Sequence, residues 1–303
     1  MCIRDRISAR LIQRNQGDFK IDNSSSSFES SLSKNFPLNT ELESYLTFRG
    51  KAKGSWLLSV SPNSESFSVR TRHSFISLPD EGYKPRKFDP RAGYGAMTFY
   101  DYASPIEDDL HVKYIRRHRL IKKYPEKEIS EAVEPIIYYL DRGVPEPVKS
   151  ALLDGGAWWN EAFEAAGFKN AFQIKVLPEG ADMLDVRYNV IQWVHRSTRG
   201  WSYGSSVVDP RTGEIIKGHV SLGSLRVRQD YLIAEGLLRP YGKENHPDDL
   251  MKEMAIKRLR QLSAHEIGHT LGFGHNFISS ARGRKSVMDY PHPLIKFSNN
   301  FCP

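Results

Sequence analysis

The chain has 303 residues, of which 39% are hydrophobic and 26% are charged, a composition typical of globular proteins and unlike disordered or fibrous ones. No apolar stretch approaches the roughly 18 residues that a membrane-spanning helix needs, so we predict no membrane span. Its two cysteines, Cys2 and Cys302, stand at the two ends, which excludes a disulfide framework or a cysteine-based metal site between them.

A net charge of +7 and a basic run at residues 113–123 raise the question of a nucleic-acid partner. Apolar residues interleave with the basic ones in this run, a pattern typical of a strand or helix with one solvated basic face. No nucleic-acid-binding motif accompanies it. We therefore predict no nucleic-acid partner.

About 300 residues suit two domains. In residues 1–128, strand-like runs such as 56–61 and 66–71 alternate with turns rich in Ser, Asn, Gly and Pro, which predicts a β-rich N-terminal domain. The serine run at 24–27 is expected to be a loop. Residues 124–131 are charged, contain proline and are expected to be a linker to a second domain over 129–303.

The second domain begins with alternating strand and helix signals. Apolar and β-branched runs predict strands, and a stripe with helical spacing predicts a helix over 145–166. Pro210 and Gly213 favour a turn between two further strands. A second long helix is expected from near Pro247 to about Leu271, because proline suits a first helical position. The predicted strands are 135–140, 172–177, 188–195, 203–208 and 214–222.

Residues 265–275 read HEIGHTLGFGH and carry three histidines. In a helix, His265 and His269 stand on one face and can reach the same metal ion. Gly272 and Gly274 are suited to ending the helix with a sharp turn, which would bring His275 back to that ion as a third ligand. The pattern predicts one catalytic zinc ion with a fourth position for water.

Glu266 follows the first predicted ligand, where a carboxylate suits a general base beside the metal better than a ligand. Zinc lowers the pKa of water to about 7, and the carboxylate can take its proton during attack on a carbonyl. The implied reaction is amide hydrolysis. Accidental spacing of ordinary histidines is the alternative, but chance gives even a bare HExxH in only roughly 2% of chains this long.

The histidine motif, followed by Ser286-Val287-Met288-Asp289-Tyr290, resembles the metzincin clan of zinc peptidases. The resemblance implies that Met288 forms a hydrophobic floor under the metal. It also implies that Tyr290 lies near zinc, as a ligand or as a donor to the oxyanion. An ordinary core methionine and an ordinary packing tyrosine are the alternatives for these two residues.

The metzincin resemblance implies an α+β fold, with a twisted mixed sheet and two long helices after the β-rich domain. Strand 203–208 would be its antiparallel edge strand, which binds extended substrate backbone. A closer resemblance is to bacterial zinc-dependent metalloproteases that join a domain of unknown function to such a catalytic domain. Segments that carry it include FDPRAGY at 88–94 and GWSYG at 200–204.

We therefore expect a zinc endopeptidase whose partner is a peptide or protein substrate. A zinc hydrolase of a non-peptide amide and a non-catalytic binding protein on the same fold are the alternatives. The resemblance implies a periplasmic or secreted location. We expect both ends to be incomplete, because residues 1–6 do not resemble a native start and Pro303 comes soon after Met288. The sequence does not predict an oligomeric state.

Overall fold

The computed structural model describes residues 3–196, 201–238 and 248–294. The chain divides into two compact units, and each is described by itself. One comprises Met1–Ser77 with Leu184–Val186, and the other comprises Leu78–Met183 with Arg187–Pro303. The division falls at residue 77, whereas the sequence places the end of the N-terminal domain at 128; that domain boundary stays a prediction.

The first unit is a four-stranded antiparallel sheet with short helices. The long strand β3 pairs with β1, β2 and β4. Its core contains three phenylalanines in contact: the Phe67 ring stacks on that of Phe48, with centroids 5.2 Å apart, and meets that of Phe19 edge to face, with centroids 5.0 Å apart. The elements are α1 (Ile3–Gln13), β1 (Gly17–Phe28), η1 (Ser30–Leu32), β2 (Lys34–Asn35), β3 (Asn39–Ala52), α2 (Ser55–Val60) and β4 (Ser66–Ile76).

Two predictions for this unit are wrong. Residues 56–61, predicted as a strand, fall largely in the helix α2, because a run of six residues is too short to separate the two periodicities. The serines at 24–27 lie inside strand β1, where pairing with β3 is interrupted between Asp22 and Ser27. The Ser24 hydroxyl donates to the Asp22 carboxylate at 2.6 Å, so the serines form an irregularity within a strand and not a separate loop.

The second unit alternates strands and helices. Three helices and one five-stranded sheet account for most of its regular structure. Its elements are η2 (Pro90–Ala92), β5 (Ala96–Tyr100), β6 (His111–Ile115), β7 (Ser130–Glu131), β8 (Ile136–Leu140), α3 (Val148–Ala165), β9 (Phe168–Lys169), β10 (Phe172–Val176), β11 (Asn189–Val194), β12 (Tyr203–Val208), β13 (Ile215–Gly223), α4 (Leu225–Leu238), α5 (Asp248–Thr270) and η3 (Phe277–Arg282).

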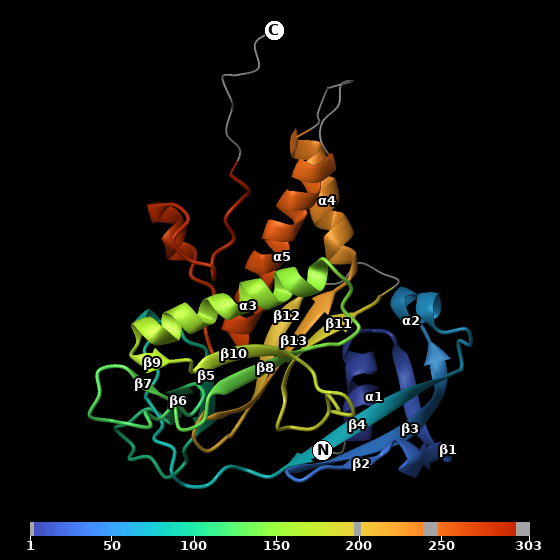
Figure 1. Ribbon diagram of the computed structural model, residues 1–303. Helices are drawn as coiled ribbons and strands as arrows, with labels where there is room; N and C mark the ends of the chain where they lie inside the picture. The colour runs from blue at the N-terminus through green and yellow to red at the C-terminus, as the bar shows by residue number, and fades with distance from the viewer. Residues whose placement is uncertain (1–2, 197–200, 239–247, 295–303) are drawn as a thin grey trace. The chain divides into compact units, whose positions relative to one another are not determined.

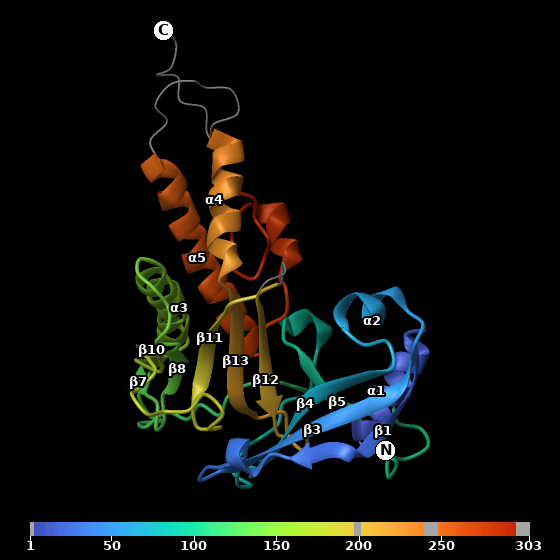
Figure 2. The same cartoon turned by 90° about the vertical axis from the view of Figure 1, so that its right-hand side faces the viewer.

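The five strands, labelled in Figure 1, lie in the order β10-β8-β11-β13-β12, which Figure 2 shows from left to right. The first four are parallel to one another, and β12 runs antiparallel to β13 at the edge. The strands predicted at 135–140, 172–177, 188–195, 203–208 and 214–222 all form. The expected α+β fold, a mixed sheet with an antiparallel edge strand and two long helices after a β-rich region, is thus confirmed.

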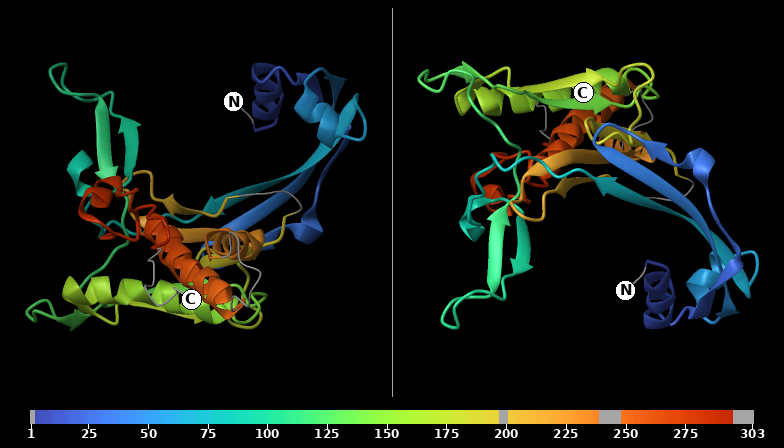
Figure 3. Two further views of the ribbon diagram at one scale, coloured as in Figure 1. Left: turned by 90° about the horizontal axis from the view of Figure 1, so that it is seen from above. Right: turned by 90° about the horizontal axis from the view of Figure 1, so that it is seen from below.

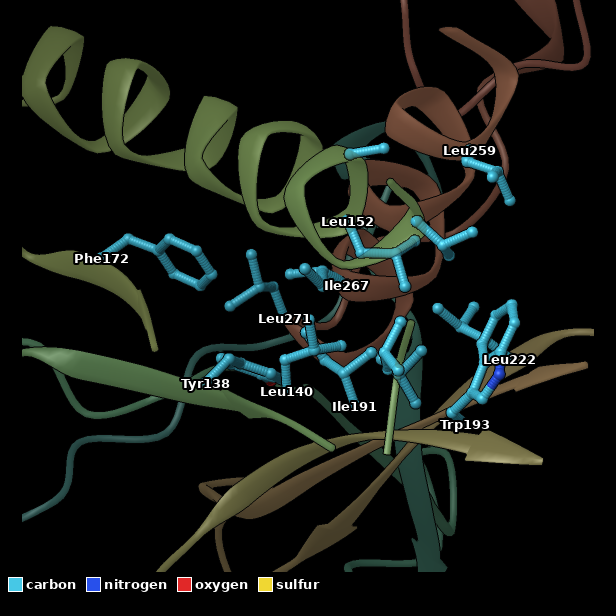
Figure 4. Close-up of a cluster of buried hydrophobic side chains, with 14 of the residues drawn as sticks. Tyr138, Leu140, Leu152, Phe172, Ile191, Trp193, Leu222, Leu259, Ile267 and Leu271 are labelled. Atoms are coloured by element: carbon cyan, nitrogen blue, oxygen red, sulfur yellow. The ribbon is translucent and has the colours of Figure 1, made fainter. Parts of the chain in front are cut away.

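The core of the unit lies between the sheet and the helices α3 and α5 (Figure 4). Parallel strands are covered by helices, so their inward side chains are fully apolar. Tyr138 and Leu140 of β8 and Ile191 of β11 are 0% exposed, as are Leu152 of α3 and Ile267 of α5. Ile267 lies within the histidine motif, so the motif helix is anchored to the sheet by its own buried face.

Helices α3 and α5 cross on the same side of the sheet (Figure 3). A side chain at Gly155 of α3 would collide with the backbone carbonyl of Arg260 in α5, so glycine permits the close approach. The Trp159 indole N–H donates to the carbonyl oxygen of Ala264 at 2.8 Å. These contacts fix the position of α5 against α3 just before the first histidine of the motif.

Helix α4 was not predicted from the sequence. It packs beside α5 (Figures 1 and 2), and it buries a carboxylate where an apolar residue would be expected. Asp230 is 0% exposed, and its two carboxylate oxygens accept from Nε of Arg226 and Nε of Arg258, each at 3.0 Å. Pairing on both oxygens offsets the cost of burying the charge.

Within the described ranges, no helix is long and apolar enough to cross a membrane.

Candidate metal centre

Helix α5 places the first two histidines at its C-terminal end. The helix ends at Thr270, one residue before the predicted end, while the predicted start near Pro247 lies outside the described residues. Gly272 then adopts φ of 105°, a left-handed conformation that favours glycine. Its N–H donates to the His269 carbonyl at 3.1 Å. The turn predicted at Gly272 therefore forms and leads directly to His275.

A segment far away in the sequence holds this turn in place. The Gly95 N–H donates to the Gly272 carbonyl at 2.7 Å, and the Gly274 N–H donates to the Gly93 carbonyl at 2.8 Å. Between these bonds, the Tyr94 ring lies against the Phe273 ring with centroids 4.6 Å apart. Residues 93–95 therefore brace the loop that carries His275.

The turn brings the three predicted ligands together. Nε2 of His269 lies 3.1 Å from Nε2 of His265 and 3.2 Å from Nε2 of His275. Nitrogens about 2.0–2.1 Å from a tetrahedral zinc ion lie about 3.3 Å from one another. The spacing of the three imidazoles therefore suits one zinc ion.

The backbone fixes which nitrogen of two rings is protonated. Nδ1 of His265 lies 2.7 Å from the Val287 carbonyl, and Nδ1 of His269 lies 2.9 Å from the Phe273 carbonyl. A carbonyl only accepts, so each Nδ1 carries the hydrogen and each Nε2 presents a lone pair. Lone pairs facing one another at 3.1 Å repel, and a cation between them removes the repulsion. This donor set fits a metal ion.

The protonation of the histidines also suits metal binding. Burial lowers the pKa of His265 to about 4, and the neighbouring His269 and His275 act in the same direction. The pKa of His275 is lowered too, by burial and then by His269. Both rings are therefore neutral near pH 7, as a metal ligand requires.

Glu266 follows His265 in helix α5, and its side chain contacts the edge strand of the sheet. Glu266 is 6% exposed, and this burial raises the pKa of its carboxyl to about 7. A hydrogen bond from the Gly204 N–H and the charge of Arg226 act in the opposite direction and lower that pKa. Gly204 lies in β12, and a side chain there would collide with the Glu266 carbonyl. Glycine thus lets the edge strand contact the histidine helix directly.

Met288 lies directly beneath the histidine helix. It is 4% exposed, and a side chain at Gly268 would collide with its sulfur and approach the Trp159 ring to 2.7 Å. The following Asp289 fixes the turn, because its carboxylate accepts from the hydroxyls of Ser279 and Ser280 at 2.9 and 2.5 Å. The predicted methionine-containing turn is therefore packed between the helix α5 and the loop after it.

Tyr290 reaches the same cluster from the far side of the turn. Its hydroxyl lies 2.7 Å from Nε2 of His275, while the residue as a whole is 61% exposed. Burial and then the charge of Glu266 raise the pKa of the phenol, so the hydroxyl keeps its proton near neutral pH. The structure brings together all six predicted site residues: His265, Glu266, His269, His275, Met288 and Tyr290.

Comparison with known families agrees with this geometry. The family described as Met-zincin matches residues 247–300, which contain the histidines and the methionine turn. The chain carries a metzincin-type zinc metallopeptidase domain. Residues 5–123 match a domain of unknown function (DUF5117). No curated protein matches the chain.

Two features of this metzincin site were not predicted from the sequence. One is the brace at 93–95, which lies within the range of the DUF5117 match and yet pairs with the zinc-site turn. The other is a cavity of about 540 Å³ that adjoins His265 and Glu266 and is bounded by α4 and α5. Neither has a local signal, because each depends on contacts between residues far apart in the chain.

Proposed function

We propose that this metzincin is an endopeptidase that hydrolyses peptide bonds at a zinc ion held by His265, His269 and His275, with Glu266 as general base. The observation that carries the proposal is the position of Glu266. It is buried, its pKa is raised to about 7, and it follows His265, whose Nε2 lies 3.1 Å from that of His269. A base with a pKa near the working pH is best suited to both accept and release a proton.

Support for a peptide substrate comes from the edge strand β12. Among the described residues it pairs with β13 alone, so its other edge offers backbone N–H and C=O groups. Exposed and half-buried residues alternate along it, and the Gly204 N–H reaches Glu266. An extended peptide added to this edge would be held by backbone hydrogen bonds beside the histidines.

In the proposed reaction each residue has a separate task. When bound, a zinc ion supplies Lewis acidity, which polarises the scissile carbonyl and lowers the pKa of water to about 7. Glu266 takes the proton of the attacking water on its carboxylate and passes it to the departing amide nitrogen. The Tyr290 hydroxyl, released from His275, donates a hydrogen bond to the oxyanion.

The test compares the intact chain with Glu266→Gln, which keeps the size of the side chain and removes its basicity. We expect the wild type to cleave casein or members of a peptide library. The variant should retain about one zinc per chain and lose at least about 100-fold in rate. Zinc binding without peptide cleavage by either protein would contradict the proposal and favour a non-peptide amidase or a binding protein.

On the family resemblance alone, we also propose that the enzyme acts in the periplasm or outside the cell. Fractionation of the native host with an antibody against the chain tests this location, and retention in the cytoplasmic fraction would contradict it.

A further inference from the structure

The cavity beside Glu266 has walls of two kinds. Apolar side chains, among them Ile233 of α4 and Leu262 of α5, face it together with the prolines at 291 and 293. At about 540 Å³ it falls within the usual range for ligand pockets. It is larger than one side chain needs, so it has room for a substrate residue and part of the backbone that carries it.

The polar end of the cavity is formed by Arg226 and Arg258, which both line it. Both bonds to the buried Asp230 use Nε. The terminal amino groups of the two guanidiniums carry no further hydrogen bond among the described residues, and the side chains stay 29% and 22% exposed. Two cations that share one carboxylate leave a net positive charge with donors in a fixed position.

The other acidic groups in the cavity wall do not occupy these donors. The carboxylate of Asp289 accepts from Ser279, Ser280 and its neighbour's backbone N–H. Glu266 lines the same cavity as Arg226 and Arg258, and among the described residues it forms no ion pair with either arginine. The arginines therefore lie close to the reaction centre without being neutralised by it.

We propose that Arg226 and Arg258 bind a carboxylate of the substrate next to the scissile bond, so that the enzyme prefers acidic peptides. This inference rests on the proposed peptidase function and names its substrate class. Residues 258, 262 and 266 are spaced four apart on one face of α5, so the cavity extends over about two helical turns, or about 12 Å, from the base. A long acidic side chain spans that depth together with an arginine reaching from the other end.

The carboxylate could come from an Asp or Glu side chain or from the C-terminus of a short peptide, and the test separates the two sources. A mass-spectrometric library first locates the cleaved bond. Pairs of peptides then carry Glu or Gln beside that bond, each made with an amidated and with a free C-terminus. The ratio of kcat/KM within each pair is independent of how much enzyme is folded.

For the wild type we expect the Glu peptide to exceed the Gln peptide by about 10- to 100-fold, because a charge-assisted pair is lost with Gln. Arg226→Met should reduce this ratio to below about 3-fold. Arg228→Met is the matched control, since Arg228 lies on the same helix but does not line the cavity; its ratio should stay at the wild-type value. A preference that follows the free C-terminus and not Glu assigns the carboxylate to the peptide end.

Binding of the same peptides to the Glu266→Ala variant, measured by fluorescence anisotropy, makes the two proposals separable. Cleavage of Glu and Gln peptides at equal rates would overturn the acidic preference and leave the peptidase function standing. Tighter binding of the Glu peptide, without cleavage of any peptide by the wild type, would overturn the peptidase function and leave the acidic binding site standing. Equal binding together with absent cleavage would overturn both.

Discussion

Gly268, between the first two histidine ligands, is the position where Met288 packs against helix α5. In a helix interior, alanine is more favourable than glycine by about 1 kcal/mol. At Gly268, however, the added methyl group would collide with the Met288 sulfur and lie 2.7 Å from the Trp159 ring. Overpacking of this kind costs about 1–3 kcal/mol. We therefore expect Gly268→Ala to destabilise the chain by up to about 2 kcal/mol.

The matched control is Gly236→Ala in α4, where the added methyl meets nothing within 4 Å. It should stabilise the chain by about 1 kcal/mol, so the two variants should differ in the sign of their effect. Denaturant unfolding in the presence of a chelator measures both values without a contribution from bound metal. Gly268→Ala should also weaken zinc binding, because the displaced Met288 lies under the ligand helix.

A double-mutant cycle with Met288→Ala assigns the cause. The smaller residue removes the collision with the sulfur and leaves the one with the Trp159 ring, so adding the methyl at Gly268 should then cost less, with a coupling of about 1–3 kcal/mol. If Gly268→Ala alone stabilises the chain as much as Gly236→Ala does, the packing of Met288 beneath the helix is wrong.

Three further outcomes are expected. Gly272→Ala should weaken zinc binding by about 5- to 100-fold, because the φ of Gly272 is 105° and the added methyl would collide with a backbone carbonyl. The control Gly180→Ala, at a φ of 74° and with open space around the methyl, should leave zinc binding unchanged. Equal effects of the two variants in a zinc-competition titration would refute this. Burial lowers the pKa of His118 to about 4, so as the pH falls this histidine is protonated in the unfolded chain before the folded one. The free energy of unfolding should therefore fall between pH 6.5 and 4, by at most about 3 kcal/mol. Denaturant midpoints should fall less steeply with pH in His118→Gln than in the wild type, and parallel curves for the two proteins would contradict this. Tyr290→Phe should lower kcat by about 10- to 1,000-fold with zinc content unchanged, and steady-state kinetics with kcat retained would remove the hydroxyl from the reaction.

The sequence predicts those parts of the molecule whose signals are local. His265 and His269 are four residues apart on a helix, and Gly272 favours the turn that brings back His275, so three ligands follow from one short segment. Strands β8 and β11 were predictable because buried parallel strands are largely continuous apolar runs. The hairpin of β12 and β13 was predictable because its turn carries Pro210 and Gly213.

The parts that were missed depend on distant contacts. Helix α4 does not show a clean apolar stripe, because one of the residues that it buries completely is Asp230, and that burial is acceptable only with Arg226 and Arg258 as partners. The serines at 24–27 lie in a strand because the pairing with β3 continues on both sides of them. The brace at 93–95 is recognisable only once its turn partner is in place.

The central claim is that the three imidazoles form one zinc site, and X-ray absorption spectroscopy of the zinc-loaded chain tests it most directly. We predict one zinc per chain with three imidazole nitrogens at about 2.0–2.1 Å, and loss of the bound metal in His269→Ala. A sulfur ligand at about 2.3 Å, which Cys2 or Cys302 would supply, or full zinc binding by His269→Ala, would contradict the account.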